Sequence, residues 1–332
     1  LSVIKSEDRG RYIIATRKIV PGTRILTAES PHCFGWLPYL IKQMCSHCFA
    51  HSDLRQQMAN NNAKLYIGCK TCQQVYYCSQ SCYDAGHYSK RGNNQVDPTS
   101  PASHYHTVLE CLVLKYLVIP SGFSFHHVSE MRMVINYIAQ TPYMPYQGTD
   151  PEFPLIKDDM SLLVGEHQQV SGKKEDKKTL RKMSSVIKKA FSLAMYDLKE
   201  TDVMELIAKS TRNCFGIWKN YEECFGLSMY CTASFFNHSC YPNAARLQKG
   251  RSIEIVALRD IEPNEEVTIC YINVTLRQCD RRTLLSDCYY FVCGCQRCLH
   301  TTPAIENAVA AYTCRNPRTR CSGYLLHLEN IS

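Results

Sequence analysis

Apolar residues return at helical spacing in the middle of this chain. They do so from residue 111 to about residue 138, which predicts a pair of core helices. From Leu180 to Leu193 they again recur every three or four positions, and residues 203–208 add a third stretch of the same kind. The pattern therefore predicts a helical block between about residues 111 and 208.

Strand-like patterns lie on both sides of that block. Residues 13–19 and 23–27 predict two short strands joined across Val20-Pro21-Gly22, where proline and glycine suit a turn. Residues 252–257 alternate between apolar and polar positions and predict a further strand. Residues 261–271 predict a turn that leads into another.

One segment that we expect to be buried ends abruptly in polar side chains. Phe235 and Phe236 are followed directly by Asn237, His238, Ser239 and Cys240, and the chain then turns at proline 242. A buried polar group without a partner costs roughly 1–3 kcal/mol. A core strand that runs into four small polar groups therefore indicates a site rather than plain packing.

Cysteine is unusually frequent, with 20 residues, many of them in tight pairs. No secretory signal pattern opens the chain, and in that setting such pairs with nearby histidines favour thiolates on zinc over disulfides. Thiolates two residues apart can share one Zn²⁺, because a tight turn brings both sulfurs to about 2.3 Å from the metal. Eight ligands, enough for two tetrahedral sites, come from Cys45, Cys48, Cys69, Cys72, Cys78, Cys82, one histidine and Cys111.

The sequence leaves the histidine of that set open. We favour His106, five residues before Cys111, over its rivals His104 and His87. The polar stretch at 90–103 is rich in proline, glycine and serine and predicts an inserted loop.

A second group of cysteines lies near the end of the chain. Cys293, Cys295 and Cys298 offer three thiolates, so a closed zinc site needs a fourth ligand from elsewhere. Cys314 and Cys321 are two cysteines and cannot close a tetrahedral site by themselves.

Length, charge and hydropathy narrow the remaining function classes. A chain of 332 residues holds two domains or one domain with large insertions. The longest apolar run, residues 112–119, is short and interrupted by Lys115, so we expect no membrane span. The net charge of +8 is modest, and the lysines at 173–189 favour a solvated helix face over a nucleic-acid surface.

The order of the paired cysteines resembles a MYND zinc finger. In that family two zinc sites interleave along the chain. The resemblance implies one site made of Cys45, Cys48, Cys78 and Cys82, and another made of Cys69, Cys72, His106 and Cys111.

Two further motifs resemble the signatures of SET-domain lysine methyltransferases. One is Asn-His-Ser-Cys-Tyr-Pro-Asn at 237–243, and the other is Asn-Glu-Glu-Val-Thr-Ile-Cys-Tyr at 264–271, with Asn264 in place of the family's glycine. Asparagine tolerates a positive φ, so we expect that turn to survive. In the family the cysteine of the first motif, here Cys240, is the fourth ligand for the trio at 293, 295 and 298.

The resemblance implies an α+β fold of the SET type, with small sheets and a threaded, knot-like cofactor site. It also implies an inserted MYND finger, a helical insertion and a closing post-SET zinc site. The implied domains are 1–44 and 213–275 for the two SET parts, 45–111 for the finger, 112–212 for the helical insertion, 276–300 for the post-SET segment and 301–332 for a short C-terminal extension.

Site roles also follow from the resemblance. The cofactor S-adenosylmethionine is expected to bind at Gly10, Asn213, Ser234, Asn237, His238, Tyr271 and Phe291. Tyr271 is expected to orient the substrate at the transfer point, with Tyr289 and Phe291 as channel walls. Gly10 matches the first glycine of the family's Gly-x-Gly motif, whereas Tyr12 stands where the second usually is.

The implied function is protein-lysine N-methylation that uses S-adenosylmethionine, in a protein stabilised by three zinc ions. The expected partner is a protein substrate with a target lysine, such as a histone tail, and we expect a monomer in the nucleus and cytoplasm. One alternative is a catalytically idle interaction module whose finger binds proline-rich peptides, which the replacement at Tyr12 favours. Another is a nucleic-acid binder, which rests on the lysine cluster and lacks an interleaved aromatic pattern.

Overall fold

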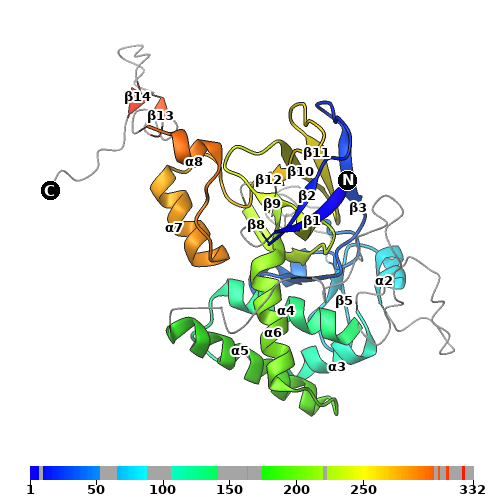
Figure 1. The fold of residues 1–332 in the computed structure, drawn as a ribbon. Helices are drawn as coiled ribbons and strands as arrows, with labels where there is room; N and C mark the ends of the chain where they lie inside the picture. Colours follow the sequence, from blue (N-terminus) through cyan, green and yellow to red (C-terminus); the bar gives the residue numbers. More distant parts are fainter. Residues whose placement is uncertain are drawn as a thin grey trace, which may run out of the picture. The chain divides into compact units, whose positions relative to one another are not determined.

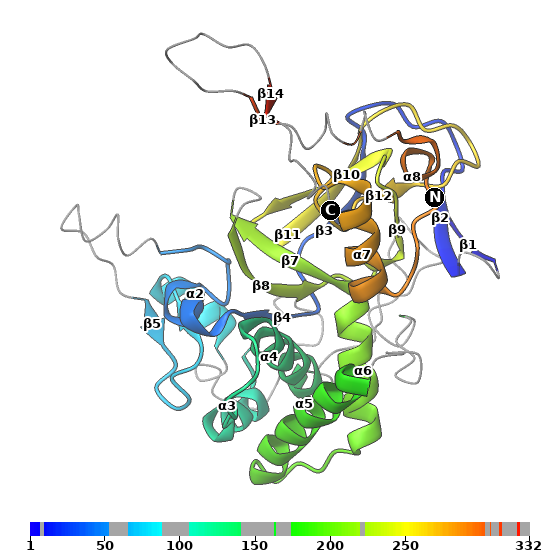
Figure 2. The same ribbon diagram turned by 90° about the vertical axis from the view of Figure 1, so that its left-hand side faces the viewer.

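The structure is a computed structural model of the 332-residue chain (Figures 1 and 2). It describes residues 1–6, 10–52, 66–87, 106–140, 163, 174–219, 223–302, 306, 312–313 and 324–325. The chain divides into two compact units. Unit 1 comprises Leu1–Ile25, Phe235–Arg246 and Ile255–Ser332, and unit 2 comprises Leu26–Ser234 and Leu247–Glu254.

Unit 1 is built from short strand pairs and two helices. Strand β1 (Ser2–Ser6) pairs antiparallel with β2 (Gly10–Ile14), and β9 (Asn237–His238) pairs in parallel with β12 (Thr268–Ile269). The helices α7 (Gln278–Tyr289) and α8 (Gln296–His300) follow. A last pair is β13 (Tyr312–Thr313) with β14 (Tyr324–Leu325).

A second small sheet has the order β10-β11-β3. Its strands are β3 (Arg24–Ala28), β10 (Ala244–Lys249) and β11 (Ser252–Ala257). Burial alternates along β11, with isoleucines 253 and 255 fully buried, as the sequence pattern predicted.

Unit 2 contains a sheet of order β4-β8-β7 and a group of helices. The strands are β4 (Cys33–Trp36), β7 (Cys214–Lys219) and β8 (Glu223–Met229). The helices are α3 (Val108–Tyr116), α4 (Phe125–Gln140), α5 (Lys174–Leu193) and α6 (Glu200–Asn213), which lie side by side in both views (Figures 1 and 2).

Close contact between α4 and β4 joins the helices to this sheet. A Cβ added at Gly35 would lie 2.0 Å from the carbonyl oxygen of Ser129, so only glycine permits this approach. The Ser129 hydroxyl donates a hydrogen bond to the Gly35 carbonyl oxygen at 2.5 Å. The same α4 contributes Met131, Val134 and Ile135 to the core that it shares with the neighbouring helices.

The remaining part of unit 2 consists of short elements between loops. They are a 3-10 helix, η1 (Pro38–Gln43), the antiparallel strands β5 (Ile67–Gly68) and β6 (Tyr76–Tyr77), and α2 (Gln80–Gly86). Side-chain caps fix two nearby helix starts, because Ser79 accepts from the amide of Cys82 and Thr107 accepts from the amide of Glu110.

The helical predictions are confirmed, and the α+β class with small sheets is confirmed with them. The strand predictions need correction near the N-terminus. The turn at 20–22 forms, but β2 ends at Ile14 and pairs with β1, while β3 pairs with β11. The partner of β2 is therefore the strand just before it in the chain, whereas β3 pairs with a strand more than 200 positions further on.

The expected strand through Phe235 is also wrong. Residues 233–235 form a short 3-10 helix, η5 (Ala233–Phe235), and the strand is β9, made of Asn237 and His238 themselves. The asparagine at 264 has a φ of 66°, so it does adopt the conformation of the glycine that it replaces.

Several predictions fall outside the described residues, namely the loop at 90–103, His104, Lys173, Cys314 and Cys321. Among the residues that are described, no helix is both long enough and apolar enough to cross a membrane.

Candidate metal clusters and active site

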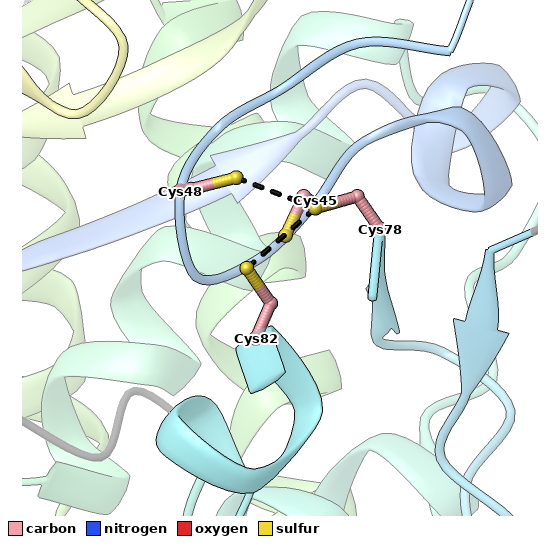
Figure 3. A group of neighbouring side chains, drawn as sticks. All are labelled: Cys45, Cys48, Cys78 and Cys82. Atoms are coloured by element: carbon pink, nitrogen blue, oxygen red, sulfur yellow. Dashed lines mark hydrogen bonds between the residues drawn. The ribbon is translucent and has the colours of Figure 1, made fainter. Parts of the chain in front are cut away.

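The first cysteine cluster lies in unit 2 and joins four thiols from one loop, the end of a strand and a helix (Figure 3). Cys45 and Cys48 lie in the loop after η1, Cys78 follows β6 and Cys82 lies in α2. The Sγ atoms of Cys48 and Cys78 are 3.6 Å apart, and those of Cys78 and Cys82 are 3.5 Å apart. These are the four residues that the MYND resemblance implies for one metal.

The second cluster is fully buried and contains Cys69, Cys72, His106 and Cys111. The Sγ atoms of Cys69 and Cys111 are 3.6 Å apart, and His106 Nε2 lies 3.6 Å from Cys72 Sγ. The structure therefore groups His106 with this set, as the sequence favoured. The rival His87 lies beside it, with its ring centroid 5.2 Å from that of His106.

Both Cys-x-x-Cys segments adopt the tight turn that a shared metal requires. The amide of Phe49 donates to the Cys45 carbonyl oxygen, and the amide of Gln73 donates to the Cys69 carbonyl oxygen, each at 3.0 Å. Phe49 and Gln73 have φ values of 64° and 52°. Each of these left-handed residues directly follows the second cysteine of its pair.

A buried polar network continues outward from His106. Its Nδ1 lies 2.7 Å from Glu110 Oε2, and the other carboxylate oxygen accepts from Asn136 Nδ2 at 2.9 Å. Asn136 Oδ1 in turn accepts from the backbone amide of Phe34 on β4 at 3.2 Å. A carboxylate on the second nitrogen of a ligating histidine fixes its tautomer and ring orientation, so Glu110 has that role here.

The third cluster lies in unit 1 and joins Cys240 to Cys293, Cys295 and Cys298. Cys240 Sγ is 3.9 Å from Cys293 Sγ and 3.6 Å from Cys298 Sγ. The fourth ligand that the trio needed is therefore Cys240, 53 residues before Cys293.

The donor geometry of all three clusters fits zinc. Four sulfurs placed tetrahedrally at about 2.3 Å from one ion lie roughly 3.8 Å apart, close to the sulfur separations in each cluster. Hydrogen bonds from neighbouring thiols lower the pKa of Cys45, Cys69 and Cys295, one residue in each cluster. Thiolates are the species that bind metal, so one thiol in each cluster favours the ligand form, while the same hydrogen bonds raise the pKa of its partners Cys48, Cys72 and Cys240.

Arg281 anchors the third cluster, and no sequence signal identified it. Its side chain is fully buried on α7 and forms hydrogen bonds of 2.9 and 3.1 Å to the two carboxylate oxygens of Glu306. It also lies 3.9 Å from Cys298 Sγ and donates to the Leu276 carbonyl oxygen. Burial alone would raise the pKa of Glu306, but Arg281 outweighs it and keeps that pKa below its ordinary value.

Tyr271 lies two residues after the end of the short strand β12, and both its hydroxyl and its backbone amide form hydrogen bonds. Its hydroxyl donates to the Phe236 carbonyl oxygen at 2.7 Å, and its backbone amide donates to His238 Nδ1 at 3.0 Å. Its ring centroid lies 5.1 Å from that of Tyr289. Burial raises the pKa of Tyr271, so its hydroxyl keeps its proton.

Aromatic rings surround this tyrosine in unit 1. The His238 ring lies 5.3 Å from the Tyr271 ring and 5.9 Å from the Phe291 ring, measured between centroids. Tyr271, Tyr289 and Phe291 are each half-buried, and Tyr289 and Phe291 pack against the cysteines of the third cluster. The structure thus brings together the three residues expected to line the transfer site.

Both ring nitrogens of His238 have partners within the protein. Nδ1 accepts from Tyr271, and Nε2 lies 3.2 Å from Cys240 Sγ. Burial lowers its pKa to about 4, so the ring is neutral at pH 7. Its neighbour Asn237 donates to Glu266 Oε1 at 3.0 Å, which ties β9 to the second sequence motif.

The other expected cofactor residues occur in two places. Gly10 starts β2 in unit 1 with a φ of 67° and open space where a Cβ would lie. Tyr12 takes a regular strand position opposite Ile4. In unit 2 the Ser234 hydroxyl lies 2.9 Å from the Asn213 carbonyl oxygen, so these two residues are in contact.

Glu110 and Arg281 are the residues that sequence reasoning missed. A signal existed for Glu110, because it follows His106 by four residues and such positions meet on a helical turn. None existed for Arg281, whose partner Glu306 lies 25 residues further on.

This chain is similar in sequence to known proteins. A model of the SET domain matches residues 10–272, a range that includes Gly10, the 237–243 motif and Tyr271. A SET domain-containing protein of Dictyostelium discoideum is 30% identical over 359 aligned positions, which cover 98% of this chain and 90% of the relative. A SET and MYND domain-containing protein of the same organism is 24% identical over 366 positions, with 97% and 88% covered. The histone-lysine N-methyltransferase SMYD3 of Homo sapiens is 39% identical over 97 positions, which cover 29% of this chain and 23% of the relative.

Proposed function

This chain belongs to the SET domain family, and from that premise we propose that it transfers a methyl group from S-adenosylmethionine to a lysine side chain of a protein substrate. The observation that carries the proposal is the placement of Tyr271. Bonds at its hydroxyl and its amide hold it, aromatic rings surround it, and the neighbouring ring of Tyr289 packs against the third cysteine cluster.

The reaction requires a neutral amine. Free lysine has a pKa near ~10.4, so at pH 7 only a fraction on the order of 10⁻³ is uncharged. S-adenosylmethionine supplies an electrophilic methyl group on a positively charged sulfur. The half-buried rings of Tyr271, Tyr289 and Phe291 disfavour the ammonium by excluding water, which raises the reactive fraction.

Tyr271 orients the amine in this proposal. Its hydroxyl proton is directed to the Phe236 carbonyl oxygen, so the phenol oxygen retains acceptor capacity for an N–H of the substrate. Holding the amine in line with the methyl group supplies an effective molarity worth roughly 7–11 kcal/mol. The ring faces also attract the lysine while it is still charged.

In unit 1 the cofactor is assigned to Gly10, Asn237, His238, Tyr271 and Phe291, whereas the same role for Asn213 and Ser234 of unit 2 rests on the sequence resemblance alone. The open left-handed backbone at Gly10 supports this assignment, because backbone can approach a ligand closely there. Both ring nitrogens of His238 bond to other protein groups, so its contribution to binding comes from backbone atoms, whereas Asn237 uses its Nδ2 on Glu266. Three zinc ions are assigned to the three clusters.

A histone tail is the first substrate to test, because one relative is named a histone-lysine N-methyltransferase. We place the protein in the nucleus and cytoplasm as a monomer.

The alternative of an idle interaction module rested on Tyr12. That residue sits in regular strand pairing, a conformation that does not require glycine, so the replacement is weak support for lost activity. The nucleic-acid alternative rested on the lysine cluster. Lys177 and Lys182 of that cluster are exposed on α5, which agrees with the solvated helix face that the sequence favoured.

The test compares three proteins with labelled S-adenosylmethionine and a panel of histone and non-histone peptides. The proposal predicts that Tyr271→Phe lowers kcat about 10²–10³-fold, as loss of one orienting hydroxyl does, without unfolding the protein. Tyr241→Phe is the matched control, since its side chain is 61% exposed in the same unit and its rate should equal wild type. Equal rates for all three proteins would overturn the assignment of Tyr271.

A further inference from the structure

The His238 imidazole connects the third cysteine cluster to Tyr271. On one side its Nε2 lies 3.2 Å from Cys240 Sγ, and on the other its Nδ1 lies 3.0 Å from the Tyr271 amide nitrogen. Cys240 is one of the four ligands of the cluster. One ring therefore contacts both the metal-binding sulfur and the residue assigned to orient the substrate.

The hydrogen-bond pattern fixes the tautomer of this ring. A backbone amide can only donate, so Nδ1 must accept from Tyr271 and carries no proton. The proton of a neutral imidazole is then on Nε2, where it points at Cys240 Sγ. A thiolate is an acceptor, so the ring donates to sulfur at one end and accepts from backbone at the other.

Strand pairing alone leaves the Tyr271 amide without a partner. The parallel pairing of β9 with β12 ends where Ile269 meets His238, and the Ile269 carbonyl oxygen accepts from the amide of Ser239. Tyr271 lies two residues beyond that last pair. His238 therefore supplies the bond that holds the backbone of Tyr271, while the Phe236 carbonyl oxygen holds its hydroxyl.

We propose that His238 is a positioning residue that transmits the geometry of the third metal site to Tyr271 through its two ring nitrogens. In this role the side chain does not bind the cofactor, because both polar atoms already have partners. Metal loss at Cys240 removes a fixed acceptor for Nε2–H and lets the ring turn away from Tyr271. Turnover then depends on occupancy of a metal site that does not touch the substrate.

Three variants separate the two ends of the ring. His238→Ala removes both bonds. His238→Asn places an amide oxygen near the position of Nδ1 and retains the acceptor for Tyr271, whereas His238→Gln places an amide nitrogen near Nε2 and retains the donor to Cys240. Ser239→Ala is the matched control, because that buried neighbour only loses its bond to the Tyr241 amide.

The first readout is zinc release to a chromophoric chelator, which needs no activity. We expect His238→Ala and His238→Asn to release one of three zinc ions about 10–100-fold faster, the usual effect of removing a hydrogen-bond partner of a metal ligand. His238→Gln and Ser239→Ala should release zinc at the wild-type rate. The two zinc ions of the finger serve as an internal reference.

The second readout is the ring itself. The protein has 12 histidines, and ¹⁵N labelling of histidine with assignment by His238→Gln resolves the resonances of this one. We expect a protonated Nε2 and an unprotonated Nδ1. A proton on Nδ1, or zinc release unchanged in His238→Ala and His238→Asn, would overturn the proposal.

The third readout rests on the proposed function. We expect His238→Ala and His238→Gln to lower kcat about 10–100-fold with an unchanged dissociation constant for S-adenosylmethionine. A weaker cofactor affinity with unchanged kcat would overturn the relay and make His238 a cofactor ligand. If wild type methylates nothing while zinc release and tautomer are as expected, the proposed function fails and the connection from Cys240 to Tyr271 stands.

Discussion

Both units place a histidine beside a cysteine cluster, yet the two histidines serve different ends. In unit 2 His106 belongs to the cluster itself, and its second nitrogen leads through Glu110 and Asn136 to the backbone of β4. In unit 1 His238 contacts the ligand Cys240 and its second nitrogen leads to Tyr271. The same side chain therefore connects one metal site to a structural sheet and the other to the residue assigned to chemistry.

Replacing a cysteine of a metal cluster is the change from which we expect the largest difference in turnover between the two units. Cys240→Ser should lower the zinc content by one ion and reduce methyl transfer about a hundredfold or more, because Tyr271 loses its support. Cys78→Ser in the finger should also lose one ion but retain cofactor binding and most of its turnover. Zinc content by mass spectrometry and initial rates measure both, and equal loss of turnover in the two variants would remove the distinction.

Glu110 tests the structural side of the comparison. Glu110→Ala leaves His106 and Asn136 without their buried partner, so we expect a loss of about 3–5 kcal/mol in the free energy of unfolding. Chemical denaturation measures it, with Glu205→Ala as control, since that carboxylate is half-exposed and its i,i+4 helix pair with Lys209 is worth about 0.3–0.5 kcal/mol. If Glu110→Ala lowered the free energy of unfolding as little as the control does, the hydrogen bonds that link Glu110 to His106 and Asn136 would not stabilise the fold.

Glu130 is a second buried carboxylate of unit 2. Unlike Glu110, which contacts a histidine, it accepts hydrogen bonds from the hydroxyls of Ser210 and Thr211. Burial raises its pKa to about 7, above an ordinary value of 4.5. The folded state then binds a proton that the unfolded state has lost, so stability falls as pH rises from 4.5 to about 7, by roughly 3 kcal/mol.

Glu130→Gln should remove that part of the pH dependence. The variant and wild type should have similar melting temperatures at pH 4.5, and the variant should be the more stable of the two at pH 8. Parallel melting curves across the whole range would show that Glu130 does not titrate between folded and unfolded states.

Local spacing made much of this molecule predictable from its sequence. The Cys-x-x-Cys pairs, the choice of His106 near Cys111 and the helices α3 to α6 follow from residues that are close in the chain, whereas the grouping of the finger ligands into two sites followed from the MYND resemblance. The Asn264 turn was predictable for the same reason, because one residue sets its backbone conformation.

The unpredicted parts depend on residues that are far apart in the chain. The strands β4 and β8 are buried along nearly their whole length, so they show no alternation of polar and apolar positions. The pairing of Arg281 with Glu306 and the bond from His238 to Tyr271 span 25 and 33 positions. Only the folded chain brings such groups together.

The most direct test of the central claim is recovery of methyl-lysine. Purified protein is incubated with labelled S-adenosylmethionine and the peptide panel, and the products are hydrolysed and separated. The account predicts label in methylated lysine at a rate that falls when zinc is removed from the cluster at Cys240. No labelled peptide, no self-labelling and no binding of S-adenosylmethionine would contradict it.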